Sequence, residues 1–318
     1  MTKKWLNFAL KFVVSASLIG FIAANFDMGF SVRLLKNIEV IFLMPAALLF
    51  LFLLINNAVR WGIVMRAIEA PLSFTKTFRL LYIGIFFNQT LPSAIGGDVV
   101  RMYLARKEGL TLQGAINGVM LERVVTLMGL ILLVVVTQPF LLDRIGDSPT
   151  KYIFPAFAAL TVIGVVILML LDRMPGRFQD HKIAHWLANL AADTKGLFFA
   201  PAIAAAGVAL GVMGNILVSA MVYTLALSLG LQVTLIDCLV LIPPVLLITT
   251  IPISIAGWGV REGAMVAAFS LIGIADGDAF TLSILFGLTS VVLSIPGGWL
   301  WIDGGYQKLD IAEEPPIR

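Results

Sequence analysis

Long runs of apolar residues, separated by short polar stretches, form the dominant pattern along this chain. The runs that approach or exceed membrane-spanning length cover residues 8–24, 41–59, 78–92, 115–140, 152–171, 201–229, 235–256, 263–274 and 279–301. A helix needs about 20 apolar residues to cross the hydrocarbon core of a bilayer. Because the runs are continuous and do not alternate with polar positions, they predict helices and not the strands of an outer-membrane barrel.

Three of these runs do not fit a simple membrane crossing. Residues 78–92 and 263–274 are short for a helix that spans unaided, and residues 235–256 contain Pro243-Pro244 and then Pro252. Proline removes a helical hydrogen bond, so we expect breaks at both places. The pattern therefore predicts an all-α polytopic membrane protein with about eight transmembrane helices and two re-entrant elements broken by proline and glycine.

The composition supports a membrane protein and excludes several other classes. Apolar residues make up 59% of the chain and charged residues 13%, whereas soluble proteins have about 45–50% and about 25%. So little polar surface argues against a soluble enzyme, a nucleic-acid binder or a disordered regulator. The net charge of +3 is typical of positive cytoplasmic loops. The single cysteine, Cys238, excludes an internal disulfide.

The placement of lysine and arginine predicts an orientation in the membrane. Lys3 and Lys4 precede the first run, which we interpret as a retained anchor with the N-terminus in the cytoplasm. If residues 78–92 crossed the membrane, the positive charges would divide almost evenly between the two sides. If this segment enters and returns, most of them lie in the cytoplasm, so a re-entrant segment is favoured. Four basic residues after the second run are expected to form a cytoplasmic surface that attracts anionic lipid: Arg60, Arg66, Lys76 and Arg79.

The end of the first short run resembles a stretch 160 residues later. Leu91–Arg101 reads LPSAIGGDVVR, and Ile251–Arg261 reads IPISIAGWGVR. The identical positions are Pro92/Pro252, Ile95/Ile255, Gly97/Gly257, Val100/Val260 and Arg101/Arg261. This match favours a duplication, and the predicted topology inverts one copy relative to the other. We therefore expect one integral membrane domain over residues 1–318, with inverted halves of about 1–140 and 152–302 and a polar tail over 303–318.

The two copies suggest a binding site within the membrane. Inverted repeats with broken helices are common in secondary transporters, whose substrates bind near the midplane. A break exposes N–H groups at the start of the next helix, where anions bind well. Arg101 and Arg261 lie near those starts, so we hypothesise a pocket for a phosphate or another anionic headgroup. The alternative is that the Pro-Gly turns only cap helices at the surface while the arginines reach water.

Two adjacent charges lie inside an apolar run. Placing Glu122 or Arg123 at the bilayer centre costs about 2.5–3.5 kcal/mol each, so both need partners. Neighbours on a helix point in different directions, so each is expected to reach a different partner. We hypothesise that Glu122 contacts one of the two repeat arginines, and that Arg123 contacts Asp98 or Glu262. The alternative is a buried salt-bridge network that only fixes helix packing. Elsewhere, Gly207 and Gly211 form a G-x-x-x-G pattern in an apolar run, which predicts close packing of this helix against another.

These motifs resemble one family. Residues 88–101 are similar to an N-x-x-L-P…G-G-D-x-x-R signature, Glu122-Arg123 to an E-R pair, and residues 251–262 to a P-x-S…G-x-G-x-R-E element. The chain is identified as resembling the lysylphosphatidylglycerol synthase transmembrane (flippase-like) family of bacterial and archaeal inner-membrane proteins. The residues expected at the substrate site are Asn88, Gly96, Gly97, Asp98, Arg101, Glu122, Arg123, Gly257, Gly259, Arg261 and Glu262, with Pro92 and Pro252 at the helix breaks.

The resemblance implies a module in the cytoplasmic membrane that moves a lipid between leaflets. The residues after the last run leave no room for the aminoacyl-transferase domain that is fused to this module in the multiple peptide resistance factor. We therefore expect a flippase, and not an enzyme, for an anionic or aminoacylated phospholipid or a lipid-linked phosphate. The alternatives are a membrane enzyme acting on lipid-linked phosphates and a scaffold that regulates a separate lipid synthase.

The expected partners follow from this interpretation. They are membrane lipids with anionic headgroups and no nucleic acid, while self-association and a separate lipid-modifying enzyme stay open. No cofactor is expected. His181 and His185 have the helical spacing of two metal ligands, but no third ligand accompanies them, so no metal is expected either.

Overall fold

The described part of the chain is helical. In this computed structural model, the structure describes residues 38–91, 96–145, 159, 163–164, 166–167, 182–250, 258–304 and 306, of which 141–145 and 182–188 are described by their backbone alone. Every regular element within those ranges is a helix. The prediction of an all-α polytopic membrane protein is thereby confirmed.

Long and short helices follow one another along the chain. Their bounds are η1 Val40–Phe42, α3 Leu43–Ala67, α4 Phe74–Thr90, α5 Gly96–Lys107, α6 Leu112–Ile145, α8 Lys182–Phe198, α9 Pro201–Ser228, α10 Leu235–Thr249, α11 Val260–Ser270 and α12 Asp276–Asp303. Among the described residues, four stretches are long and apolar enough to cross a bilayer: Val40–Ala67, Leu112–Phe140, Pro201–Ser228 and Asp276–Asp303. The predicted runs 8–24 and 152–171 lie wholly or mostly outside the described residues.

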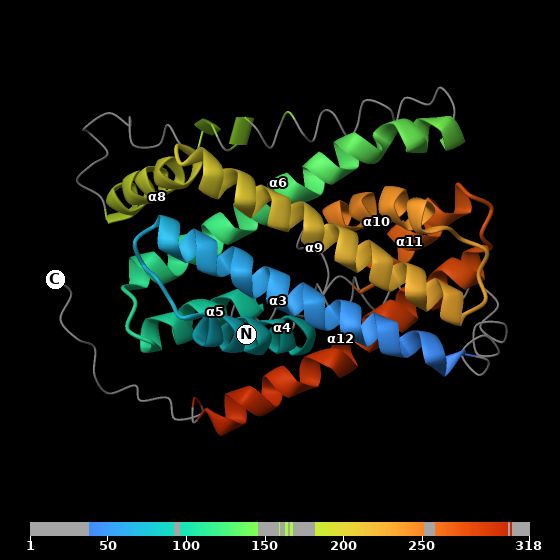
Figure 1. Ribbon diagram of the computed structural model, residues 1–318, viewed down its shortest axis with the longest axis horizontal. Helices are drawn as coiled ribbons and strands as arrows, with labels where there is room; N and C mark the ends of the chain where they lie inside the picture. The colour runs from blue at the N-terminus through green and yellow to red at the C-terminus, as the bar shows by residue number, and fades with distance from the viewer. Residues whose placement is uncertain are drawn as a thin grey trace, which may run out of the picture.

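Two short hairpins lie at opposite ends of a bundle of long helices. Figure 1 shows α3, α6, α9 and α12 along the molecule, with α4 and α5 toward one end and α10 and α11 toward the other. At the α4–α5 end, Lys76 Nζ lies 2.8 Å from Glu108 Oε2, and the Tyr306 hydroxyl donates to Glu108 at 2.9 Å. Lys76 thereby lowers the pKa of Glu108. At the opposite end, the Glu39 N–H donates to the Ser228 carbonyl oxygen at 3.0 Å.

Pro243 and Pro244 do not interrupt α10. The helix begins after Thr234, whose hydroxyl accepts from the Asp237 N–H while the Asp237 carboxylate accepts from the Thr234 N–H. From this capping box the helix continues through both prolines, so the predicted break at this pair is wrong. Membrane helices tolerate proline where neighbouring helices pack around it. Here both prolines are buried, and α10 contacts α6, α9 and α11. The second predicted break, at Pro252, lies outside the described residues.

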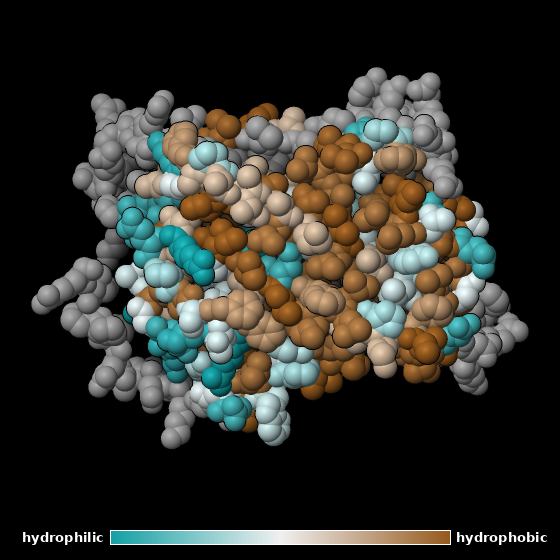
Figure 2. Space-filling view, in the orientation of Figure 1, coloured by the Kyte–Doolittle hydropathy of each residue, from teal (hydrophilic) through white to brown (hydrophobic). Residues whose placement is uncertain are grey.

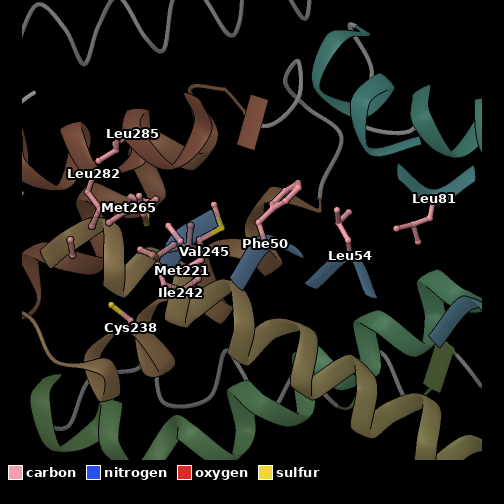
Figure 3. Packing of buried hydrophobic residues seen from close by; sticks show 14 of the residues in the cluster. Phe50, Leu54, Leu81, Met221, Cys238, Ile242, Val245, Met265, Leu282 and Leu285 are labelled. Carbon is pink, nitrogen blue, oxygen red and sulfur yellow. The ribbon is translucent and has the colours of Figure 1, made fainter. Parts of the chain in front are cut away.

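Buried apolar side chains join the helices into one core. In Figure 3, side chains of α9, α10, α11 and α12 point toward one another around Val245. Phe50 and Leu54 of α3 extend this cluster toward Leu81 of α4. The core therefore links both hairpins to the long helices.

The surface is also apolar over much of its area. Along α3, Met44, Leu48 and Phe52 are all exposed. Figure 2 shows hydrophobic residues across the middle of one face, with polar residues toward the ends and most densely at the end where α8 lies. An apolar exterior of this extent marks contact with a membrane.

Three glycines bring α6 and α9 close together. A Cβ on Gly129 would lie 2.5 Å from the carbonyl carbon of Gly211, and a Cβ on Gly207 would lie 3.1 Å from Val125 Cγ1. Small residues allow close backbone approach between membrane helices. The close packing predicted for Gly207 and Gly211 is therefore confirmed as a crossing of α9 with α6.

Replacing Gly129 by alanine is expected to lower the free energy of unfolding by about 1–3 kcal/mol, because the added methyl group overpacks the crossing. The measurement is the thermal unfolding midpoint of purified protein in detergent, followed by circular dichroism. Gly62→Ala is the matched control, since a Cβ there meets nothing within 4 Å and alanine favours a helix. Equal midpoints for G129A and G62A would contradict the packing role.

Candidate functional site

Five charged residues from three helices form the central ion cluster: Arg60 of α3, Asp98 and Arg101 of α5, and Glu122 and Arg123 of α6. Arg60 donates to Glu122 Oε1 through Nη2 at 2.5 Å and through Nε at 3.0 Å. Arg101 Nη2 donates to Glu122 Oε2 at 3.0 Å. Arg123 donates to Asp98 Oδ2 through Nε at 2.7 Å, and its Nη2 lies 2.6 Å from the same oxygen. The cluster thus ties α3, α5 and α6 together through charge-assisted contacts.

Arg101 lies at the centre of this cluster. Besides Glu122, its Nη2 lies 3.4 Å from Asp98 Oδ1, and its guanidinium lies 4.5 Å from the ring centroid of buried Trp61. A cation over a tryptophan face is attracted by the ring's electrons. Only 5% of Arg101 is exposed, and its Nε has no hydrogen-bond partner in the described part of the chain. A buried donor of this kind is costly to leave unsatisfied.

The α4–α5 hairpin places Arg101 beside the other charges. A Cβ on Gly97 would overlap the carbonyl oxygen of Gly84, so only glycine allows α5 to lie this close to α4. The Gly97 N–H donates to Asn88 Oδ1 at 2.9 Å, which satisfies one free donor at the start of α5. Gly96 packs on Leu91, where a Cβ would lie 2.8 Å from the leucine side chain. These contacts fix the direction in which Arg101 leaves α5.

A cavity of about 210 Å³ opens beside the cluster. It is lined by Asn57, Arg60, Leu81, Gly84, Ile85, Asn88, Asp98, Arg101, Glu122, Arg123 and Thr126. Arg60, Asp98, Arg101 and Glu122 are buried, whereas 49% of the Arg123 side chain is exposed, so Arg123 marks the rim. The described lining contains three arginines and two carboxylates and therefore carries one excess positive charge.

A second ion pair starts α11. The carboxylate of Glu262, which is fully buried, accepts the Gly259 N–H at 2.5 Å and the Arg261 Nη2 at 2.7 Å. Ser283 of α12 donates to the same carboxylate at 3.1 Å and accepts from Arg261 Nε at 3.2 Å. Gly259 has a φ of +87°, a conformation that favours glycine. We call Gly259, Arg261, Glu262 and Ser283 the α11 cluster.

The α11 cluster is closed and neutral, in contrast to the central one. The Arg261 guanidinium lies 4.7 Å from the ring centroid of Trp258 and packs against α12 at Gly287, where a Cβ would overlap it. One arginine faces one carboxylate, and neither side chain lines the cavity. This geometry holds α11 onto α12.

The structure separates the predicted site residues into two groups. Asn88, Asp98, Arg101, Glu122 and Arg123 line the cavity, while Gly96 and Gly97 shape the hairpin behind it. The expectation that Arg101 and Arg261 share one pocket is not met, because the described contacts of Arg261 are made with α11, α12 and Trp258. Gly259, Arg261 and Glu262 therefore belong to the α11 cluster. The predicted Pro92, Pro252 and Gly257 lie outside the described residues.

The chain matches one known family over most of its length. The family described as the lysylphosphatidylglycerol synthase TM region matches residues 8–297. The chain belongs to this family. The residues matched include both hairpins and both clusters, so the two sites described above lie within the family's own region.

Two curated relatives match only short parts of the chain. A UPF0104 membrane protein of Methanothermobacter thermautotrophicus is 33% identical over 90 residues, which is 28% of this chain and 25% of that protein. A UPF0104 membrane protein of Pyrococcus horikoshii is 28% identical over 78 residues, which is 24% of this chain and 23% of that protein. The chain thus spans about a quarter of the length of these curated relatives. No solved structure matches the chain.

Arg60 is the main site residue whose position was predicted wrongly from the sequence. It was expected on a cytoplasmic surface, but it is 4% exposed and paired with Glu122. Asn57 and Thr126 also line the cavity. A polar stripe could have indicated that Arg60 faces the other helices, because residues 56, 57 and 60 lie on one face of α3 at helical spacing.

Within the described residues, no group of three or more His, Cys, Asp or Glu side chains is placed to hold a metal ion. His181 and the side chain of His185 lie outside that part of the chain. The chemistry that the central cavity offers is therefore that of arginine: forked N–H donors and positive charge, suited to a phosphate or carboxylate group.

Proposed function

We propose that this protein moves a phospholipid between the two leaflets of a cytoplasmic membrane, with the lipid's headgroup held in the central cavity and its acyl chains left in the bilayer. The proposal is supported by the family assignment, by the apolar exterior, and above all by the arginine-lined cavity among membrane-spanning helices. On this proposal the protein is a transporter and not an enzyme.

The position of the cavity along α6, a helix long and apolar enough to cross a bilayer, is the observation that carries the proposal. Glu122 lies ten residues after Leu112, the first residue of α6, which corresponds to about 15 Å of helix. That distance is about half of the ~30 Å hydrocarbon core. Ionisable groups at such depth are expensive and mark substrate pathways in membrane proteins. A lipid headgroup that changes leaflets has to pass through the same depth.

The two hairpins are proposed to be re-entrant segments of inverted halves. Both α4–α5 and α10–α11 contain helices shorter than a membrane crossing, and they lie at opposite ends of the bundle. Each ends in a helix with an arginine near its start, Arg101 in α5 and Arg261 in α11. In this arrangement the first hairpin contributes to the headgroup site, and the second is held onto α12 by its own ion pair.

Lipid movement by the purified protein tests the proposal. Protein is reconstituted into liposomes that contain a phospholipid with a fluorophore on one acyl chain, and dithionite is added to bleach the outer leaflet. Liposomes with protein are expected to lose label from both leaflets, whereas protein-free liposomes keep the inner label. Mass spectrometry of the same lipids identifies any product, which would indicate an enzyme; neither movement nor product would indicate a scaffold.

Replacing Arg101 by glutamine is expected to slow lipid movement roughly tenfold or more, because losing one partner of a buried charged contact costs about 2–5 kcal/mol. Arg106→Gln is the matched control, since Arg106 lies on the same helix but is exposed at the end of α5. The same rate in R101Q, R106Q and wild type, with all three folded, would place the transport pathway elsewhere.

A further inference from the structure

We infer that the central cavity selects a lipid headgroup with one net negative charge, a phosphodiester that carries only neutral hydroxyl groups beyond the phosphate, and that it discriminates against aminoacylated headgroups that carry a cation. This inference rests on the proposed function and names the substrate class of the same site. It follows from two features of the cavity: its carboxylates already pair with arginines, and one positive charge stays unbalanced.

The carboxylates that line the described cavity are engaged with arginine. Both oxygens of Glu122 accept from arginines, Oε1 from Arg60 and Oε2 from Arg101. Asp98 Oδ2 accepts from Arg123, while Oδ1 lies 3.4 Å from Arg101 Nη2. An ammonium group on a headgroup would therefore compete for each of these carboxylates with an arginine that already pairs with it.

The cations, in contrast, exceed the carboxylates by one. Arg60, Arg101 and Arg123 face Asp98 and Glu122 around the described lining. Arginine stays charged at all physiological pH values. One bound phosphodiester monoanion neutralises the excess, whereas a zwitterionic headgroup leaves it in place and a cationic headgroup increases it.

One donor in the lining has no partner. Nε of Arg101 is buried without a hydrogen bond in the described part of the chain, although the same guanidinium is held by Glu122 through Nη2 and lies over Trp61. A phosphate oxygen is the acceptor that this donor fits best, since hydrogen bonds between arginine and phosphate are short and charge-assisted. The Arg101 side chain lines the cavity, so a headgroup oxygen that reaches this buried nitrogen would supply the acceptor that it lacks.

The size of the cavity agrees with a small headgroup. Its volume of about 210 Å³ lies below the ~300–1,000 Å³ of pockets that enclose drug-sized ligands. The cavity therefore takes a phosphate with a short polar extension, and an extension as long as an esterified lysine would project past the rim at Arg123. The α11 cluster offers no equivalent, because its arginine and carboxylate balance each other.

Competition between headgroups tests this selectivity. Wild-type protein moves acyl-labelled phosphatidylglycerol in the dithionite assay, while unlabelled phosphatidylglycerol, phosphatidylethanolamine or lysyl-phosphatidylglycerol competes in the same liposomes. Phosphatidylglycerol is expected to compete roughly tenfold better than lysyl-phosphatidylglycerol, which corresponds to about 1.4 kcal/mol, with phosphatidylethanolamine between them. Glycerophosphoglycerol, the soluble deacylated headgroup, is tested for uptake in a separate arm.

Arg123→Gln provides the charge test. This variant removes the excess charge at the half-exposed rim and frees an oxygen of Asp98, so the preference for phosphatidylglycerol over phosphatidylethanolamine is expected to fall toward one. A purely structural role of Arg123 would instead slow every lipid by the same factor and leave the preference intact. Arg106→Gln serves as the control and is expected to keep the wild-type preference.

The outcomes separate the inference from the proposed function. Equal competition by all three lipids, stronger competition by lysyl-phosphatidylglycerol, or an unchanged preference in R123Q would overturn the charge selectivity while lipid movement itself stands. Uptake of glycerophosphoglycerol without movement of labelled lipid would mean that the substrate is a soluble phosphodiester and not a lipid. No movement of any lipid would remove the proposed function and the inference with it.

Discussion

Replacing Glu122 by glutamine is expected to lower the free energy of unfolding by about 3–5 kcal/mol, the cost of removing one partner of a buried ion pair. The carboxylate holds Arg60 and Arg101, which are 4% and 5% exposed. Without it, two buried arginines lose their shared counter-charge. The measurement is the thermal or chemical unfolding of purified protein in detergent.

Glu108→Gln is the matched control for that substitution. Glu108 also pairs with a cation, Lys76, but the lysine side chain is 49% exposed, and a pair of this kind contributes about 0–1 kcal/mol. A double variant, E122Q with Arg60→Gln, restores the charge balance and is expected to recover part of the loss. If E122Q destabilises the protein no more than E108Q does, then Glu122 does not balance the buried arginines.

The second large effect is expected at the start of α11. Glu262→Gln is expected to lower the free energy of unfolding by about 3–5 kcal/mol, because it leaves buried Arg261 without its carboxylate. The substitution also weakens the contact that holds the Gly259 N–H at the helix start. The unfolding midpoint in detergent measures the loss.

Ser283→Ala is the control for Glu262→Gln. The serine hydroxyl contacts both Arg261 and Glu262, but its removal leaves the ion pair in place. A single neutral hydrogen bond contributes about 0.5–1.5 kcal/mol, so S283A is expected to lose much less than E262Q. Equal losses for the two variants would mean that the charge of Glu262 is unimportant for the α11 cluster.

Much of the architecture could be predicted because it follows from hydrophobicity. The four long apolar stretches of the described chain correspond to predicted runs, and the short runs at 78–92 and 263–274 correspond to α4 and α11. Pro243 and Pro244 were misjudged because proline disfavours a helix locally, whereas packing against other helices decides whether it breaks one. That packing is not visible in a single run of residues.

The candidate site could be predicted only in part. Glu122 and Arg123 stood out because charges in apolar runs are rare, and Asp98 stood out as part of the G-G-D-x-x-R motif. The structure joins them through Arg101. Arg60 was misjudged because positive charge near the end of a span usually marks the cytoplasm. The separation of the two repeat arginines depends on Ser283 and Glu262, whose contacts involve two helices and cannot be inferred from spacing.

The most direct measurement compares lipid movement by Arg101→Lys and Arg261→Lys in liposomes, each normalised to the amount of folded protein. Lysine keeps the charge but loses the forked donors of arginine. If the headgroup passes through the central ion cluster, R101K is expected to be much slower than wild type, while R261K keeps the wild-type rate per folded molecule. Loss of movement in R261K with a normal rate in R101K would contradict the assignment of the headgroup to the central cavity.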